Sequence, residues 1–244
     1  MFYSQQGEDI YIYSRYINTF CSDGIFVELG GMNGVIYSNS KFFEDTLGFT
    51  GVLIEPTEQF NELVKNRPNA KCYKKAVSNK PGIVKFIGTS ATAGIADSMD
   101  DKFRTIFHSN SSTYPVVADT FSNILSDANI KYIDLLSIDV EGAEKLVLDT
   151  MDWNIDVYVM VIELDGHNNI KDEGCRQILK SKGFIYDTRI NINEFWINPN
   201  YKNKDRLFDT TKIFNKNFNN INEVGQLYCV EPHVIPEIIR ELKK

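Results

Sequence analysis

In the stretch Ile25-Phe26-Val27-Glu28-Leu29-Gly30-Gly31-Met32-Asn33-Gly34, a short apolar run leads to an acid and then to three glycines in five residues. The apolar run predicts a buried strand, and a helical pattern begins after Ser38 and Asn39. A strand, a glycine turn and a helix in this order are typical of an α/β sheet that binds a nucleotide-like ligand at the carboxyl ends of its strands. Glycine suits such a turn because it allows positive φ and lets the backbone approach a ligand closely.

The spacing of the glycines excludes two common nucleotide motifs. The dinucleotide fingerprint needs G-x-G-x-x-G, but counting from Gly30 places Met32 and Val35 where glycines are required. A P-loop is excluded because no Gly-Lys-Ser/Thr follows. The pattern that remains is Glu28-x-Gly30-x-x-x-Gly34. On this motif alone, an ordinary tight strand-to-helix turn with a capping acid stays open.

Further apolar runs that predict buried strands also end in acids. The runs cover 51–54, 135–138 and 157–162, and the acids are Glu55, Asp139 and Glu163. Glu55 lies 25 residues after Gly30, where an acid is the usual partner of a ribose diol. A solvated glutamate at the strand end is the alternative for Glu55. Because parallel strands share one carboxyl edge, we expect these three acids and Glu28 on the same edge of the sheet.

Strands that alternate with helical patterns predict an α/β fold with a mostly parallel, doubly wound sheet. We expect a single domain over 1–244, because 43% of the residues are hydrophobic and the chain is long enough for one large core. It begins with an N-terminal helical segment at 1–21, in which a helix covers about 7–19. It ends with a C-terminal extension from about 200 to 244, after an antiparallel last strand at 195–197.

Smaller elements are expected after the second buried strand. Cys72-Tyr73 and 76–78 are expected to form a third strand. The turn signal at 79–82 returns the chain into a strand at 83–87, which predicts a β-hairpin appendage. The small residues of 88–94 predict a mobile loop near the site, and a phosphate-binding loop is the alternative.

Charge and cysteine content narrow the function. The formal net charge is -7 without a long basic run, which disfavours nucleic-acid binding. The four cysteines form no C-x-x-C, which excludes zinc ribbons and thioredoxin-like chemistry and predicts buried free thiols in a reducing compartment. Glu8, Asp9 and Arg15 argue against a signal peptide. No apolar run approaches ~18 residues, so we expect no membrane span and a cytoplasmic protein.

Several longer motifs occur in one order over roughly 4–200. They are Ser4-Gln5-x-Gly7-Glu8-Asp9, Glu28-x-Gly30-x-x-x-Gly34, Ser38-Asn39, Ile54-Glu55-Pro56, Ala76-Val77-Ser78 and Ile138-Asp139-Val140-Glu141-Gly142-Ala143-Glu144. In these motifs the chain resembles FkbM-type methyltransferases, and the last motif is the most specific. Two departures are that Gly31-Met32 stand where the family often has Ala and a polar residue, and that the residues after about 200 match no part of the family.

The resemblance implies a Rossmann-like class I methyltransferase fold that binds S-adenosylmethionine. It also implies methyl transfer to oxygen, on a small-molecule or glycan hydroxyl such as that of a sugar or polyketide. By this resemblance Glu28 and the glycines hold the amino-acid end of the cofactor, Glu55 holds the ribose, and 76–78 form the adenine edge. The full set of expected cofactor-binding residues is Glu28, Gly30, Gly31, Asn33, Gly34, Ser38, Asn39, Glu55, Pro56, Ala76, Val77, Ser78 and Asp139.

A hydroxyl acceptor is a poor nucleophile until a base removes its proton, so we expect a base within hydrogen-bonding reach. Asp139, at the end of a central strand, is the first candidate, either as the base or as the residue that holds the acceptor. Glu163 and His167 are the other catalytic candidates, and a surface-loop histidine is the alternative for His167. Asp139, Glu163 and Asp165 are alternatively the ligands of one Mg²⁺ ion, which takes oxygen ligands and acidifies a diol.

The sequence also allows other residue roles and other functions. Glu141 and Glu144 are expected to serve the N-terminus of the helix that follows them. A non-catalytic binding or scaffold protein with the same fold is the alternative function, and failure to bind S-adenosylmethionine would favour it. A methyltransferase that acts on a protein or on another small molecule is a further alternative. A structured tail often lies at a subunit contact, so a homo-oligomer is also expected as one alternative.

Overall fold

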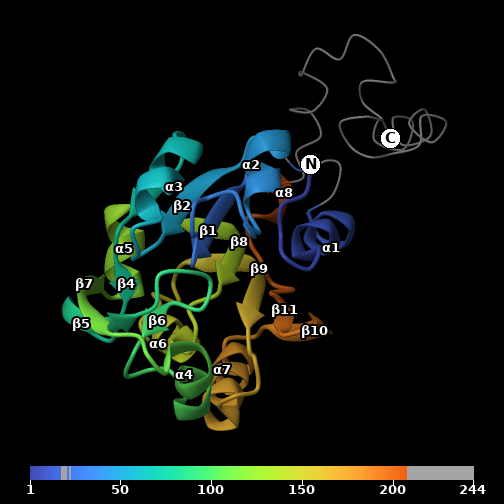
Figure 1. The fold of residues 1–244 in the computed structure, drawn as a ribbon. Helices are drawn as coiled ribbons and strands as arrows, with labels where there is room; N and C mark the ends of the chain where they lie inside the picture. Colours follow the sequence, from blue (N-terminus) through green and yellow to red (C-terminus); the bar gives the residue numbers. More distant parts are fainter. Residues whose placement is uncertain (18–20, 22, 208–244) are drawn as a thin grey trace, which may run out of the picture.

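The computed structural model describes residues 1–17, 21 and 23–207, whose elements are arranged as Figure 1 shows. Most of the expected C-terminal extension therefore lies outside the described residues. The expectation of a single domain over 1–244 includes that part of the chain and stays a prediction.

Seven strands form the main sheet in the order β10-β11-β9-β8-β1-β2-β3. Their bounds are β1 Ile25–Leu29, β2 Thr50–Ile54, β3 Lys71–Tyr73, β8 Tyr132–Ile138, β9 Asp156–Glu163, β10 Ile185–Ile190 and β11 Asn193–Ile197. The strands from β3 to β9 in this order run parallel, and β11 runs antiparallel to both β9 and β10. The predicted α/β fold with a mostly parallel sheet and an antiparallel C-terminal strand is confirmed.

Helices cover both faces of this sheet (Figure 1). One core cluster contains side chains of α1 (Glu8–Arg15), α2 (Lys41–Leu47) and α3 (Phe60–Asn66). The other contains side chains of α5 (Phe121–Asp127), α6 (Glu144–Asp149) and α7 (Asn169–Ser181). In β1, Phe26 belongs to the first cluster and Val27 and Leu29 to the second, because successive side chains of a strand point to opposite faces.

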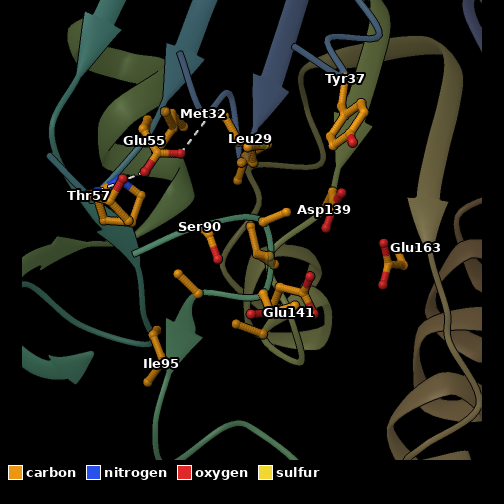
Figure 2. A pocket seen from close by; sticks show the side chains of 18 of the residues that line it. Leu29, Met32, Tyr37, Glu55, Thr57, Ser90, Ile95, Asp139, Glu141 and Glu163 are labelled. Atoms are coloured by element: carbon orange, nitrogen blue, oxygen red, sulfur yellow. Dashed lines mark hydrogen bonds between the residues drawn. The ribbon is translucent and has the colours of Figure 1, made fainter. Parts of the chain in front are cut away.

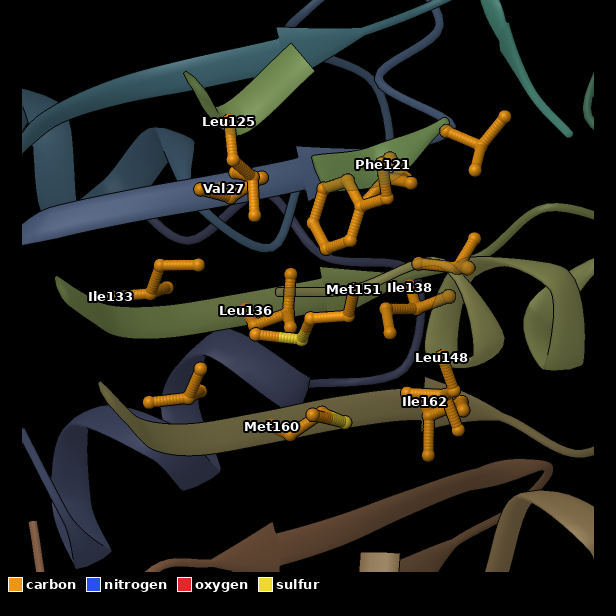
Figure 3. Close-up of a cluster of buried hydrophobic side chains, with 14 of the residues drawn as sticks. Val27, Phe121, Leu125, Ile133, Leu136, Ile138, Leu148, Met151, Met160 and Ile162 are labelled. Carbon is orange, nitrogen blue, oxygen red and sulfur yellow. The ribbon is translucent and has the colours of Figure 1, made fainter. Parts of the chain in front are cut away.

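The second cluster shows how a helix is held on the sheet. Phe121 and Leu125 of α5 are fully buried and lie over Val27 and Leu136 of the central strands (Figure 3). Phe121 and Leu125 are four residues apart and therefore share one helix face. Full burial of a side chain of this size stabilises the fold by roughly 1.5–3 kcal/mol.

A second sheet corrects two expectations. It contains β4 (Ala76–Val77), β5 (Gly82–Ile87), β6 (Gly94–Ile95) and β7 (Thr113–Asp119), in the order β4-β7-β5-β6. The expected third strand is wrong, because its two halves become β3 in the main sheet and β4 in this one. The expected hairpin is also wrong, because β4 and β5 both pair with β7 and not with each other. The turn between them was recognised, but turn chemistry alone does not specify which strands pair.

Two short helices were not predicted from the sequence. They are α4 (Asp101–His108) and α8 (Lys204–Leu207). Asp100 caps α4 by accepting hydrogen bonds from the backbone N–H groups of Lys102 and Phe103. Phe103, Ile106 and Phe107 share one face of α4 at helical spacing, but of these three only Phe103 is buried, while Ile106 and Phe107 are exposed.

The N-terminal helix is shorter than the expected 7–19. It ends where Tyr16 leaves the helical region with φ -124°. Before it, Ser4 Oγ donates to Asp9 Oδ1 (2.6 Å) and the Asp9 N–H donates to Ser4 Oγ (3.3 Å). This reciprocal pair holds the segment that precedes the helix.

In the part of the chain that the structure describes, no helix combines the length and the apolar character needed to span a bilayer. Cys175 is buried and Cys72 is half-buried, and neither forms a disulfide with a described residue. Cys229 lies outside the described residues.

Candidate functional site

A cavity of about 360 Å³ lies at the carboxyl ends of the central strands. The order of the strands changes direction here, since β2 lies on one side of β1 and β8 on the other. In open α/β sheets this switch point is where ligands bind. Figure 2 shows side chains from the β1, β2, β8 and β9 ends around the cavity, with Ser90 and Ile95 of the second sheet region opposite them.

Gly30 lines the cavity where the ends of β1 and β8 meet. Its φ is +80°, and a Cβ at this position would lie 2.0 Å from the backbone oxygen of Asp139. The Asp139 N–H donates to the oxygen of Leu29 (3.3 Å), so the two strand ends stay joined at this point. Only glycine satisfies both the positive φ and the close approach.

Glu55 lines the cavity at the end of β2 and is almost fully buried. One carboxylate oxygen accepts from the Met32 N–H (2.9 Å) and the other from the Thr57 N–H (2.7 Å), as Figure 2 shows. Burial raises the pKa of Glu55, and the bonds from Thr57 and Met32 oppose that rise. Each oxygen keeps a further lone pair, so the carboxylate can still accept from a diol.

Glu28 does not line the cavity. Its carboxylate points to the α2 side of the sheet, where it accepts from Ser38 Oγ (2.8 Å), Ser40 Oγ and the Asn39 N–H (2.8 Å). Arg67, fully buried, approaches it to 3.8 Å. An acid at a helix N-terminus is stabilised by the unpaired N–H groups there, so Glu28 holds the start of α2.

Asn39 does line the cavity, next to this cluster. Its Nδ2 donates to Ser137 Oγ of β8 (3.0 Å). Its Oδ1 is buried and accepts no hydrogen bond from a described residue. Buried polar atoms are nearly always paired, so this unpaired oxygen is an exception among the described residues.

Three carboxylates gather at the opposite wall. Oxygens of Asp139, Glu141 and Glu163 lie within 4.8 Å of one another (Figure 2). Burial, and then the neighbouring negative charges, raise the pKa of all three groups above the usual carboxyl range. These acids therefore hold protons at a pH where isolated carboxyls have lost them.

The loop that carries Asp139 and Glu141 is held from behind by Glu144. The buried Glu144 carboxylate accepts from the Gly142 N–H (3.0 Å) and pairs with Lys171 of α7. The expected helix N-terminus role thus fits Glu144. It is wrong for Glu141, whose φ is +51° and whose side chain lines the cavity.

Asp165 and His167 form a separate pair on the cavity wall. His167 Nδ1 lies 2.7 Å from Asp165 Oδ2, and the His167 N–H donates to Asp165 Oδ1 (2.9 Å). The imidazole stands edge-on to Phe103 of α4, with ring centroids 5.4 Å apart. The sequence suggested Asp139, Glu163 and Asp165 as a possible metal-binding group. In the structure the third member of the group is Glu141, and Asp165 is not part of it.

The structure brings most of the expected site residues to this one cavity. Those that line it are Gly30, Asn39, Glu55, Pro56, Ala76, Val77, Asp139, Glu163, Asp165 and His167. The expected residues that do not line it are Glu28, Gly31, Asn33, Gly34, Ser38 and Ser78. Several of these support the turn instead: Asn33 Oδ1 accepts from two following N–H groups, and Gly34 (φ +80°) makes room for Arg67.

Other lining residues were missed by sequence reasoning. Gln5 and Glu8 reach the cavity from the N-terminal segment, where Glu8 accepts from Asn193 Nδ2 of β11 (2.7 Å). Tyr37 stands over the cavity beside Asp139 (Figure 2). The motifs around Gln5, Glu8 and Glu141 were visible in the sequence, but nothing in them indicated where the side chains point. The expected loop at 88–94 does border the cavity, through 90–93.

Residues 28–186 match the methyltransferase FkbM domain family. The chain belongs to this family. Its membership supports S-adenosylmethionine-dependent methyl transfer, the activity that the cavity has to accommodate. A search of the curated proteins found no match for this FkbM methyltransferase.

Solved structures resemble this FkbM methyltransferase only distantly. One is precorrin-6y C5,15-methyltransferase from Geobacter metallireducens, at TM-score 0.39 and 10% identity over 69% of this chain and 67% of that one. Another is a SAM-dependent methyltransferase from Aquifex aeolicus, at TM-score 0.35 and 10% identity over 73% and 82%. A third is Haemonchus contortus phosphoethanolamine N-methyltransferase 1, at TM-score 0.39 and 9% identity over 80% and 40%.

Proposed function

We propose that this protein is an O-methyltransferase that moves a methyl group from S-adenosylmethionine to a hydroxyl group of a sugar or glycan. One observation carries the proposal: the acid at the end of β2 and the carboxylates at the ends of β8 and β9 line the same cavity. The acid at the end of β2 can accept hydrogen bonds from a ribose diol, and the carboxylates at the ends of β8 and β9 can remove a proton from a hydroxyl group.

The donor would lie along the β2 side of the cavity. Glu55 would accept from the ribose hydroxyls, and Ala76 and Val77 would flank the adenine. When bound, S-adenosylmethionine supplies an activated methyl group on a sulfonium, and the protein supplies its alignment. The buried Glu55 carboxylate, held by two backbone N–H groups, is pre-oriented for that contact.

Asp139 is the first candidate for the base. Its pKa is raised to about 7, chiefly by burial and then by the charge of Glu144. A base with a pKa near the working pH combines an ionised fraction with real basicity. Glu163, whose carboxylate lies beside that of Asp139, would accept or retain the second proton of the pair. His167, oriented by Asp165, is the alternative base.

The charge of the cavity favours an uncharged acceptor. Among the described residues that line the cavity, Lys75 is the only lysine or arginine, and it is paired with Asp119 (2.8 Å). The lining acids are Glu8, Glu55, Asp139, Glu141, Glu163 and Asp165. A phosphate or carboxylate on the acceptor would face these acids without a partner, whereas sugar hydroxyls can donate to them.

Magnesium is the second interpretation of the carboxylate cluster. Oxygen ligands suit Mg²⁺, and the ligands would come from Asp139, Glu141 and Glu163. If EDTA abolishes turnover and added Mg²⁺ restores it, the three carboxylates bind a metal ion. If turnover in EDTA is unchanged, the carboxylates act in proton transfer.

The test is to incubate the protein with S-adenosylmethionine and a panel of neutral glycosides, and to identify methylated products by mass spectrometry. We expect Asp139→Asn to lower turnover by about 10²- to 10⁴-fold, the usual contribution of general-base catalysis. Binding of S-adenosylhomocysteine by calorimetry should be retained. Turnover at the wild-type level would rule out both the base and the metal role of Asp139.

Two other outcomes would favour other functions. Failure to bind either S-adenosylmethionine or its product would favour a non-catalytic scaffold. Methylation of a protein or of another small molecule, with glycosides untouched, would keep the enzyme class and change the acceptor. The cytoplasmic location, the homo-oligomer and the absence of nucleic-acid partners stay predictions.

A further inference from the structure

An exposed aromatic ring of α4 borders the main cavity. Of the large apolar side chains that are exposed in the described part of the chain, only those of Tyr37 and Phe107 line this cavity. A single exposed apolar residue on an ordinary surface needs no explanation. Phe107 differs because it is 50% exposed and lies at a cavity wall, where a bound ligand would cover it.

Phe107 is the outer member of a row of three rings. Phe103 and Phe107 are four residues apart and share one face of α4, with ring centroids 4.6 Å apart. The buried Phe103 ring in turn meets the imidazole of His167 edge-on, at 5.4 Å. All three rings line the cavity, so the row forms an aromatic wall from α4 to the loop after β9.

The helix that presents Phe107 is held at both ends. Asp100 caps its first turn, as described above. At its other end, His108 Nε2 lies 2.7 Å from the backbone oxygen of Thr92, and it donates to that oxygen because a carbonyl only accepts. Thr92 itself lines the cavity. Phe107 precedes His108 directly, so its backbone is fixed relative to the cavity wall.

The aromatic wall lies on the acceptor side of the cavity. The proposed donor occupies the β2 side, on one side of β1, whereas His167 follows β9, on the other side. The contact of Phe103 with His167 therefore places α4 near the carboxylates that follow β8 and β9. An acceptor has to lie there, because its hydroxyl must reach the base.

Hydrogen-bond acceptors adjoin the aromatic wall. Glu141 and Asp165 border a small side pocket together with Phe103 and His167. A pyranose ring has the matching pattern, since its hydroxyls donate along the edge and its C–H groups form an apolar face. The face of an aromatic ring carries partial negative charge and attracts such C–H groups. An open-chain polyol has the same hydroxyls but no rigid apolar face.

We propose that Phe107 packs against the C–H face of a pyranose acceptor and is a specificity-determining residue of this enzyme. Phe103 supports the ring of Phe107 from below, and the neighbouring acids accept from the sugar hydroxyls. This inference rests on the proposed function and narrows its acceptor to a sugar in ring form. Phe107 lies outside every motif on which the family resemblance depends.

Steady-state kinetics tests the contact. The acceptors are the methyl pyranosides of glucose, galactose, mannose and rhamnose, with S-adenosylmethionine as donor. For each pyranoside that the wild type methylates, Phe107→Ala should raise KM about 3- to 10-fold, the usual worth of one aromatic contact. The kcat should stay within about twofold of wild type, because the contact is equal in the ground and transition states. S-adenosylhomocysteine affinity, measured by calorimetry, should be unchanged, which also shows that the variant is folded.

Three further variants separate the ring from other effects. Phe107→Tyr keeps the aromatic face and should retain a KM near that of the wild type. Phe107→Leu keeps an apolar side chain but loses the ring, so its KM should resemble that of Phe107→Ala. Ile106→Ala is the matched control, because Ile106 is 57% exposed on the same helix and does not line the cavity. Its KM should equal that of the wild type.

Three results would overturn the inference and leave methyl transfer to a hydroxyl in place. The first is an unchanged KM in Phe107→Ala for every methylated pyranoside. The second is a loss of S-adenosylhomocysteine affinity as large as the rise in KM, which would place the ring against the donor. The third is a preference for open-chain alditols over the pyranosides.

A different result would reach the proposed function itself. If the wild type binds S-adenosylhomocysteine but methylates no sugar, the proposed acceptor class fails and the inference fails with it. If the wild type does not bind S-adenosylhomocysteine, the proposed donor fails as well.

Discussion

At Gly30 the backbone has a φ of +80°, and an added Cβ would lie 2.0 Å from the backbone oxygen of Asp139. Two costs therefore apply to any side chain there: the left-handed conformation and the collision with β8. A residue such as Gly183 has a similar φ of +85° but no atom within 4 Å of its Cβ position. Alanine substitutions at Gly30 and Gly183 therefore separate the free-energy cost of the left-handed backbone conformation from the cost of the steric collision.

We expect Gly30→Ala to lower the free energy of unfolding by about 3 kcal/mol or more, since the collision is with backbone and not with a flexible side chain. Gly183→Ala should cost about 1–2 kcal/mol, the conformational part alone. Urea denaturation of the two variants measures the difference. Equal losses would contradict the close approach of the β1 and β8 ends.

At the scale of elements, α7 holds the loop that follows β8. Lys171 of α7 pairs with Glu144, which is almost fully buried and which accepts the Gly142 N–H. The catalytic candidate Asp139 lies at the start of this loop. A charged pair between two elements thus sets the position of a loop that strand packing alone leaves undefined.

Lys171→Met should lower the free energy of unfolding by about 3–5 kcal/mol, because Glu144 would be left buried without its cation. Lys145→Met is a matched control, since its partner Asp149 is exposed and such pairs contribute about 0–1 kcal/mol. Thermal and urea unfolding compare the two. A loss in Lys171→Met no larger than in Lys145→Met would show that the pair does not hold the loop.

At the scale of the whole molecule, the acids at the carboxyl edge make stability depend on pH. The pKa values of Asp139, Glu141 and Glu163 are raised in the folded state, above the values of about 4 expected in the unfolded chain. Above pH 4 the folded protein therefore binds more protons than the unfolded chain. Stability then falls as the pH rises toward the raised values.

We expect the free energy of unfolding without ligand to decrease between about pH 5 and pH 8, and Glu163→Gln to make this decrease shallower. At pH 8 the variant should be more stable than the wild type by roughly 1–2 kcal/mol, about one pKa unit of differential protonation. Glu173→Gln, at an exposed glutamate of α7, should follow the wild-type curve. An identical slope for Glu163→Gln and wild type would contradict the raised pKa values.

Local patterns in the sequence were sufficient for the α/β class, for the strand ends that carry Glu55, Asp139 and Glu163, and for the family, because period, turn residues and motif order are local properties of the chain. They failed for the β3 and β4 segments, which are separated by two residues yet pair in different sheets. They also did not indicate which way Glu28 and Glu141 point: Glu28 is buried beneath α2, and Glu141 reaches the cavity.

The physical reason is the direction of side chains. The sequence by itself determined that acids and glycines follow buried strands, since hydrophobic periodicity and backbone freedom are properties of adjacent residues. Only the tertiary structure decided which of these groups face the cavity and which are paired behind it. That depends on contacts between residues far apart in the chain, such as Asn39 with Ser137 and Glu144 with Lys171.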